Sequence, residues 1–144
     1  MSNPIRRYES QDQEAIIAIW EASSRIATPF LSDDYMDKTR QQIRDVWLPT
    51  AETWVFDGDD GLAGFITLIG NEIGGIFVDP KTQGQGVGRS LMDWASLHHE
   101  PLLVEVFEAN RIGRQFYERY GFRETNRYYH KPTDQDMIRM ICMG

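Results

Sequence analysis

One stretch constrains the fold of this chain more than any other, residues 76–91. It opens with a short apolar run, which Asp79 and Pro80 end because proline has no amide hydrogen to continue a β-ladder. Glycines then occupy positions 84, 86 and 88, and an apolar helical pattern follows at once. The pattern predicts a strand, a glycine-rich turn and the N-terminus of a helix in direct succession.

A turn of this kind is suited to binding an anion. The first turn of a helix carries unpaired N–H groups and the positive end of the helix dipole. Glycines let the backbone approach the anion closely, because no Cβ intervenes. We therefore interpret the turn as a binding site for a pyrophosphate.

Two common phosphate-binding motifs fit the turn less well. A P-loop ends in Gly-Lys-Ser/Thr, whereas Arg89 and Ser90 follow Gly88 here. The dinucleotide fingerprint has the spacing G-x-G-x-x-G, whereas the chain reads G-x-G-x-G from Gly84. Glu108 does lie about twenty residues further on, where a dinucleotide-binding domain places its ribose ligand. A nucleotide-binding oxidoreductase therefore remains a weaker alternative.

The remaining apolar patterns predict one α/β domain over residues 1–144. The strand-like runs are residues 4–9, 52–56, 62–69, 72–78, 102–107, 122–130 and 137–143. A helix separates the run at 72–78 from the run at 102–107, so we expect these two strands to pair in parallel. Turn signals at residues 57–61 and 70–71 predict two antiparallel hairpins before them.

Four helices are expected between these strands. The first covers about residues 11–26, with Ser10 as its cap in a capping box with Gln13. The second runs from Ser32 and Asp33 to about Leu48, where Pro49 is expected to stop it. The third follows Gly86. The fourth begins at Asn110, carries Ile112, Phe116 and Tyr120 on its apolar stripe, and ends at Gly121.

Two segments together resemble one family. The spacing Gln83-x-x-Gly86-x-Gly88 resembles the acyl-CoA signature Q/R-x-x-G-x-G/A of the GCN5-related N-acetyltransferases. Residues 110–122 resemble the N-x-x-A-x-x-F-Y-x-x-x-G-F segment of the same family, with Gly113 in place of the usual alanine. The order of elements also matches over nearly the whole chain, and the likeness is greatest to small stand-alone bacterial members.

The resemblance implies a fold and a cofactor site. It implies a mixed sheet of about seven strands flanked by about four helices, whose two central parallel strands splay apart around acetyl-CoA. The cofactor-binding residues it implies are Ile76, Phe77, Val78, Gln83, Gly84, Gln85, Gly86, Val87, Gly88, Arg89, Ser90, Asn110, Phe116 and Tyr117. The strand residues pair with the pantetheine arm, the turn holds the pyrophosphate, and Asn110 hydrogen-bonds the pantetheine side.

The resemblance also implies transfer of an acetyl group from acetyl-CoA to a primary amine, with Tyr117 as the general acid. A primary amine has a pKa of ~10.4 in solution, so it must lose a proton before it attacks a thioester. By period-two alternation Glu72 is expected on one face with Gly74, Ile76 and Val78. It falls where histone-acetyltransferase members of the family carry their glutamate base, so the resemblance implies Glu72 as the base. Glu105 and Glu108 are alternatives.

Composition sets the remaining expectations. The chain has 41% apolar residues and a single cysteine, Cys142, so it can build a core and has no internal disulfide. A net charge of −7 argues against a nucleic-acid partner. The sequence shows neither the apolar length of a membrane span nor an N-terminal signal peptide. We expect a cytoplasmic monomer or homodimer that binds no metal and no membrane.

The sequence contains no motif that identifies the acceptor. A small polyamine, an antibiotic, an amino acid, a lysine side chain or a protein N-terminus all remain open. The acceptor groove is expected to involve the first helices and the loop at residues 28–32. A non-catalytic acyl-CoA-binding domain is the leading alternative from another functional class.

Overall fold

The computed structural model describes residues 3–143, and it is built on one seven-stranded sheet. The strand order is β1-β2-β3-β4-β5-β7-β6, and only the central pair β4–β5 is parallel. The strands are β1 Ile5–Arg7, β2 Glu52–Gly58, β3 Gly61–Ile69, β4 Glu72–Val78, β5 Leu102–Phe107, β6 Arg123–His130 and β7 Gln135–Cys142. The predicted parallel pair and the mixed sheet are confirmed.

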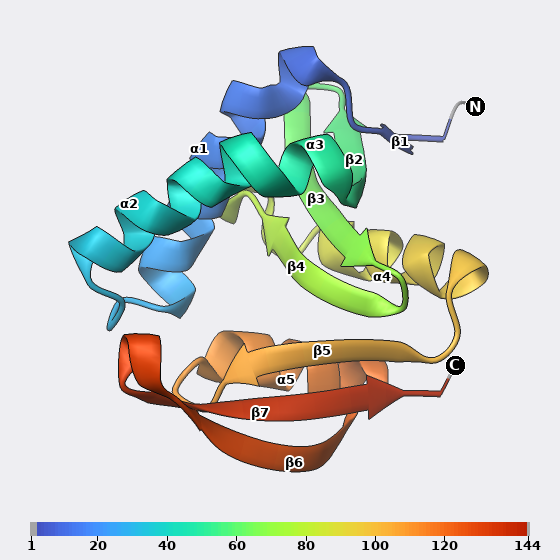
Figure 1. Cartoon of the computed structure of the whole chain (residues 1–144). Coiled ribbons are helices and arrows are strands. Elements are labelled where there is room, and N and C mark those ends of the chain that lie inside the picture. Colours follow the sequence, from blue (N-terminus) through green and yellow to red (C-terminus); the bar gives the residue numbers. More distant parts are fainter. Residues whose placement is uncertain (1–2, 144) are drawn as a thin grey trace.

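The two central strands separate almost as soon as they meet. They pair only at Glu72 with Leu103 and at Ile73 with Val104. Beyond these two positions β4 and β5 diverge, so the sheet consists of an upper half, β1–β4, and a lower half, β5–β7 (Figure 1). The splay that the resemblance implied is therefore present.

The helices cover the two faces of the sheet unequally. Within residues 3–143, four helices have ten residues or more: α1 Gln13–Ala27, α2 Asp33–Gln42, α4 Val87–His98 and α5 Arg111–Tyr120. In Figure 1, α1 and α2 lie in front of the upper half-sheet, while α4 and α5 lie behind the sheet. In this view, none of these four helices lies in front of the lower half-sheet.

Each face of the sheet carries a separate apolar cluster. Residues of α1, such as Ile16 and Trp20, pack with Val55 and Phe65 on one face of the sheet. On the other face, Leu91 and Met92 of α4 join a larger cluster that extends into β5, β7 and α5. The larger cluster packs against both halves of the sheet, so the halves are held together although β4 and β5 diverge.

The first helix does not begin as predicted. Residues Ser10–Asp12 form a 3-10 turn before α1, and the Asp12 carboxylate accepts a hydrogen bond of 2.9 Å from the Glu9 N–H. The same buried carboxylate accepts two bonds of 2.9 Å from the Arg6 guanidinium. These bonds hold the pKa of Asp12 below its usual value. The predicted Ser10 cap is therefore wrong, and Asp12 satisfies the backbone instead.

The second helix, predicted to run to about Leu48, ends at Gln42, and two shorter helical turns continue the chain to Thr50. After α2 the chain forms a π-turn, Ile43–Trp47, and then a short turn, α3 Leu48–Thr50, that contains Pro49. Proline is tolerated in the first turn of a helix, because its missing N–H would have no partner there. The π-turn leads into Trp47, whose ring packs over β4: a Cβ added to Gly74 would lie 3.1 Å from it.

Candidate active site

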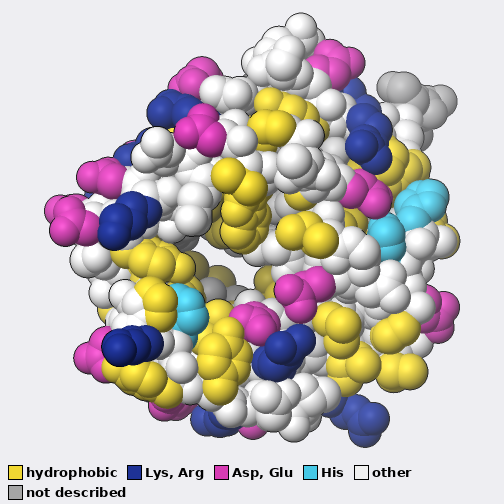
Figure 2. All heavy atoms as spheres, in the orientation of Figure 1, with side chains coloured by type: hydrophobic (Ala, Val, Ile, Leu, Met, Phe, Trp, Pro, Cys, Tyr) yellow, Lys and Arg dark blue, Asp and Glu magenta, His cyan; other side chains and the backbone are white. Residues whose placement is uncertain are grey.

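A cavity of about 530 Å³ lies where β4 and β5 diverge. Its wall is formed by β4 and β5, by α1, α2 and the π-turn on one side, and by the first turn of α4 and the first two turns of α5 on the other. Figure 2 shows the hollow between the two halves of the molecule, with hydrophobic, acidic and histidine side chains around it. Residues that are far apart in sequence therefore share one solvent-accessible space.

The floor of the cavity is an irregular piece of β4. Thr67 of β3 pairs with Gly75, while the next residue, Leu68, pairs with Ile73, so Gly74 is an extra, unpaired residue. Such a bulge breaks the alternation of side chains along a strand. Ile73, Ile76 and Val78 consequently all pack on the α4 side. The prediction that Glu72 shares a face with Ile76 and Val78 is wrong.

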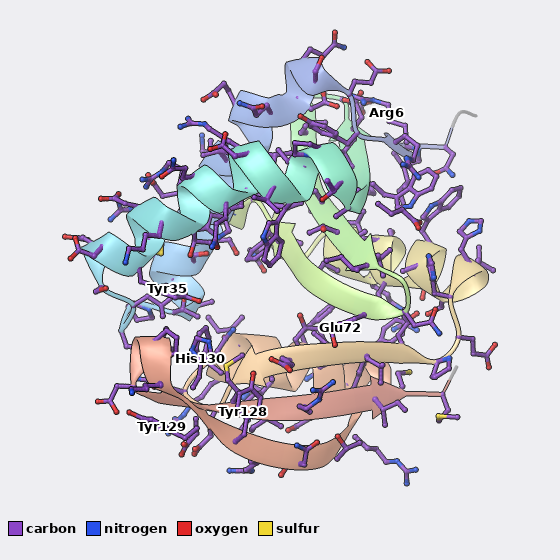
Figure 3. The ribbon with its side chains drawn as sticks, in the orientation of Figure 1. Arg6, Tyr35, Glu72, Tyr128, Tyr129 and His130 are labelled. Atoms are coloured by element: carbon purple, nitrogen blue, oxygen red, sulfur yellow. The ribbon has the colours of Figure 1, made fainter. Side chains whose placement is uncertain are left out.

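Glu72 lies instead at the opening of the cavity, on the side that Figure 3 presents. Its side chain is about half exposed, and its Oε1 lies 3.5 Å from Nη2 of Arg139. The same guanidinium lies 3.3 Å from Glu105, the alternative base on β5. Arg139 thus bridges two carboxylates that line the cavity from different halves of the sheet.

Glu105 has one further partner. The Tyr128 hydroxyl donates to it at 2.5 Å, and this bond raises the pKa of Tyr128 to about 12. Glu108, the other alternative base, lies outside the cavity wall and faces Arg127 at 3.8 Å. Among the three glutamates, the structure brings Glu72 and Glu105 to the cavity.

The glycine-rich turn has the geometry expected of an anion site. Gly84 and Gly86 have φ angles of 83° and 78°, and nothing lies within 4 Å of a Cβ added to either. Gly86 directly precedes α4, so the N–H groups of that helix start are next to an open surface. Gln83 and Gly88 line the cavity, which links the turn to β4.

Gly88 is a glycine for a different reason. A Cβ at this position would lie 3.1 Å from the ring of Phe116 and 3.5 Å from Val78. Its lack of a side chain therefore allows α5 to approach α4 and β4 closely. Sequence spacing alone does not distinguish these two uses of glycine.

The other residues predicted to bind the cofactor at the turn differ in their burial and in their distance from the cavity. Val87 is buried in the core, so only its backbone faces the turn. The Ser90 N–H donates to the Gly86 carbonyl within the first helical turn. Gln85 and Arg89 are exposed, and Arg89 borders a separate depression with Asp93 and Arg123. Arg89 is thus outside the main cavity.

Asn110 caps α5 and faces the cavity as well. Its Oδ1 accepts a 2.8 Å hydrogen bond from the Gly113 N–H, which confirms the predicted cap. A Cβ on Gly113 would lie 2.6 Å from the Asn110 amide nitrogen. Glycine at position 113 therefore makes room for the capping side chain itself.

Tyr117 is the buried residue of α5, contrary to the predicted stripe. It is only 6% exposed, whereas Ile112, which was expected to be buried, is 53% exposed. The Tyr117 ring packs edge-to-face against Phe122, which follows the helix stop at Gly121. Burial raises the pKa of the phenol, so it stays protonated at neutral pH. Tyr117 nevertheless lines the cavity and can offer a proton there.

The far side of the cavity includes residues that sequence reasoning missed. Thr28 and Leu31 of the expected loop do line it, together with Tyr35, Trp47, Phe107 and His130. The last four of these residues belong to no recognisable sequence motif, and they share only an aromatic or imidazole side chain. Their positions on a π-turn, at strand ends and on α2 are decided by packing.

Two further observations concern residues 3–143 as a whole. No helix in that range is long and apolar enough to cross a membrane. In the same range, no three His, Cys, Asp or Glu side chains are grouped so as to hold a metal ion.

The sequence matches the family described as acetyltransferase (GNAT) domain over residues 49–124. It is 36% identical over 124 residues to the peptidyl-lysine N-acetyltransferase YjaB of Salmonella typhimurium, which covers 85% of each chain. It is 31% identical over 119 residues to the peptidyl-lysine N-acetyltransferase YiaC of Escherichia coli, which covers 82% of each chain.

Solved structures give the same result. The solution structure of apo-form YjaB from Escherichia coli has a TM-score of 0.87 and 31% identity, covering 100% of this chain and 99% of that chain. The PaiA N-acetyltransferase of Thermoplasma acidophilum, solved in complex with coenzyme A, has a TM-score of 0.74 and 19% identity over 100% of both chains. At this lower identity the likeness concerns the fold alone.

Proposed function

Because the chain belongs to the GNAT acetyltransferase family and is an acetyl-CoA-dependent N-acetyltransferase, we propose that its acceptor is the side-chain amine of a protein lysine. The relatives at 31–36% identity are named for this acceptor. The observation that carries the proposal is the cavity, which combines apolar walls with two carboxylates near its opening. A lysine side chain has the matching form, an aliphatic stem that ends in a cation.

Acetyl-CoA would bind from the side of α4 and α5. Beyond Ile73 the backbone of β4 has no partner on β5, so its polar groups are free to pair with the pantetheine arm at Ile76, Phe77 and Val78. The N–H groups of the turn at residues 83–88, with the Ser90 hydroxyl, would hold the pyrophosphate. Asn110 and Phe116 would line the same path, while Arg89 would add positive charge on its outer side.

The reaction requires two proton movements. The amine nitrogen forms a bond to the acetyl carbon and gives up a proton, and the carbon–sulfur bond breaks to leave a thiolate. Glu72, at the opening of the cavity, would receive the amine proton. Tyr117, buried beside the pantetheine path, would supply a proton to the thiolate. The peptide N–H groups at the Gly74 bulge would stabilise the developing oxyanion.

The acceptor can be tested directly with peptides. With acetyl-CoA, a short peptide that has one lysine and a blocked N-terminus should release free thiol, and mass spectrometry should locate the acetyl group on the lysine. The same peptide with arginine in place of lysine serves as the control. Thiol release that occurs only with small amines or with free peptide N-termini would contradict the lysine proposal.

We expect Gly86→Asp to abolish stabilisation by acetyl-CoA. A ligand that binds only the folded state adds about 2.7 kcal/mol at 100 times its Kd, so wild-type Tm should rise with acetyl-CoA. Aspartate would place a negative charge where the phosphates bind. Gly70→Asp is a matched control, because Gly70 also has a positive φ, 60°, and open surroundings. A wild-type shift with NAD but not with acetyl-CoA would overturn the cofactor site.

We expect Tyr117→Phe to lower turnover by about 10²–10⁴, the usual contribution of a general acid. The ring and its contact with Phe122 remain, so Tm and acetyl-CoA affinity should change little. Tyr120→Phe is the control on the same helix, since that hydroxyl bonds to Asp93, outside the cavity. If single-turnover rates of the Tyr117 variant equal those of wild type, the tyrosine serves packing only.

We expect Glu72→Gln to reduce kcat/KM at neutral pH, with a loss that shrinks as pH rises. Glutamine keeps the shape but accepts no proton, and at higher pH more of the amine is already neutral. Glu124→Gln, which alters an exposed carboxylate paired with Arg127, is the control. An unchanged pH–rate profile for Glu72→Gln would move the role to Glu105 or to water.

A further inference from the structure

Four aromatic rings connect the two halves of the molecule at the wide end of the cavity. Phe30, from the loop after α1, meets Phe107 at the end of β5, with ring centroids 5.5 Å apart. Phe107 meets His130 at 6.1 Å, and His130 meets Tyr35 of α2 at 6.4 Å. All three contacts are edge-to-face, an arrangement that aromatic rings favour.

This aromatic bridge lies opposite the point where β4 and β5 are still paired. The two halves are therefore joined at both ends of the gap, by Glu72–Leu103 pairing at the narrow end and by the bridge at the wide end. Figure 3 shows Tyr35 on the upper half and His130 on the lower half, close together at the left end of the hollow. The opening is consequently a closed ring rather than a cleft with one free end.

The bridge is held in place from both sides. Tyr35 lies in the first turn of α2, where its N–H donates to the Ser32 hydroxyl at 3.1 Å. Nδ1 of His130 lies 2.8 Å from the Thr133 hydroxyl, and that hydroxyl also lies 3.3 Å from the His130 carbonyl oxygen. The carbonyl can only accept, so both contacts are made when Nδ1 carries the ring proton. Thr133 thus fixes the orientation of the imidazole.

From this geometry we infer that Tyr35 and His130 determine which amines the enzyme accepts, by closing the acceptor opening into a ring that admits only a slender, unbranched chain. This inference rests on the proposed lysine function and adds a selectivity device to it. An amine on a linear methylene stem can pass through this opening, between the two carboxylates and the aromatic side chains. An amine attached to a cyclic or branched carbon is too wide to pass unless Tyr35 or His130 is truncated.

The test compares two peptides that differ only at the acceptor residue. One has lysine, and the other has 4-aminocyclohexylalanine, whose primary amine is attached to a six-membered ring. Steric pockets discriminate by about 10–200-fold for small differences in size. Wild type should therefore prefer the lysine peptide. Tyr35→Ala should lower the ratio of kcat/KM for the lysine peptide to kcat/KM for the aminocyclohexylalanine peptide at least ~10-fold, mainly by raising the rate with the second peptide.

Several variants separate selection from general damage. Tyr35→Phe keeps the ring and should keep the wild-type ratio, and His130→Ala should lower the ratio as Tyr35→Ala does. Thr133→Val should lower the ratio partially, whereas Thr133→Ser should not. Tyr129→Ala is the matched control, since this neighbouring tyrosine is 57% exposed and its hydroxyl bonds to Asp134. The Tm shift with acetyl-CoA reports that each variant is folded.

The outcomes distinguish this inference from the lysine proposal. If wild type leaves the lysine peptide unmodified, the lysine proposal fails, and the same ratio is then measured with hexylamine and cyclohexylamine. If the ratio in folded Tyr35→Ala and His130→Ala stays within twofold of wild type for either pair of amines, the aromatic bridge does not select the acceptor and the inference is overturned.

Discussion

The rest of the structure depends on the early divergence of two parallel strands. β4 and β5 share only two paired positions before they separate. In an ordinary sheet the next residues would continue the ladder, because buried backbone groups need hydrogen-bond partners. Here the unpaired edges face a cavity of about 530 Å³, where a substrate with amide groups of its own can supply those partners. The divergence thus provides both the space and the binding edges.

The divergence is tolerated because the helices do not share one core. The cluster around α1 holds the upper half-sheet from one face, and the cluster around α4 extends under both halves from the other. The aromatic bridge of Phe30, Phe107, His130 and Tyr35 then joins the halves again at the far side of the opening. The two halves are therefore joined at both ends of the cavity, although no strand pairing spans its middle.

Several glycines near the cavity are explained by the side chain that occupies the place of their missing Cβ. Trp47 packs over Gly74, Phe77 over Gly75, Phe116 over Gly88 and the Asn110 amide over Gly113. By contrast, Gly84 and Gly86 have open surroundings and positive φ angles. Only the second group has the geometry of a turn built around a ligand. The first group lets aromatic rings and a helix cap approach the backbone, which shapes the cavity that the ligands share.

The amino-acid sequence alone was sufficient to predict the strand–turn–helix at residues 76–91, the parallel partner of β4 and the Asn110 cap, because these depend on local spacing and on the residues themselves. It was not sufficient for features that depend on contacts between distant segments. The bulge at Gly74 turned Glu72 away from Ile76, and the packing of Phe122 made Tyr117 rather than Ile112 the buried residue of α5. Tyr35, Trp47, Phe107 and His130 have no sequence signature, since only the folding of α2, the π-turn and the strand ends against one another brings them to the cavity. Local patterns therefore determined the elements and the glycine-rich turn, whereas tertiary packing decided which side chains line the cavity.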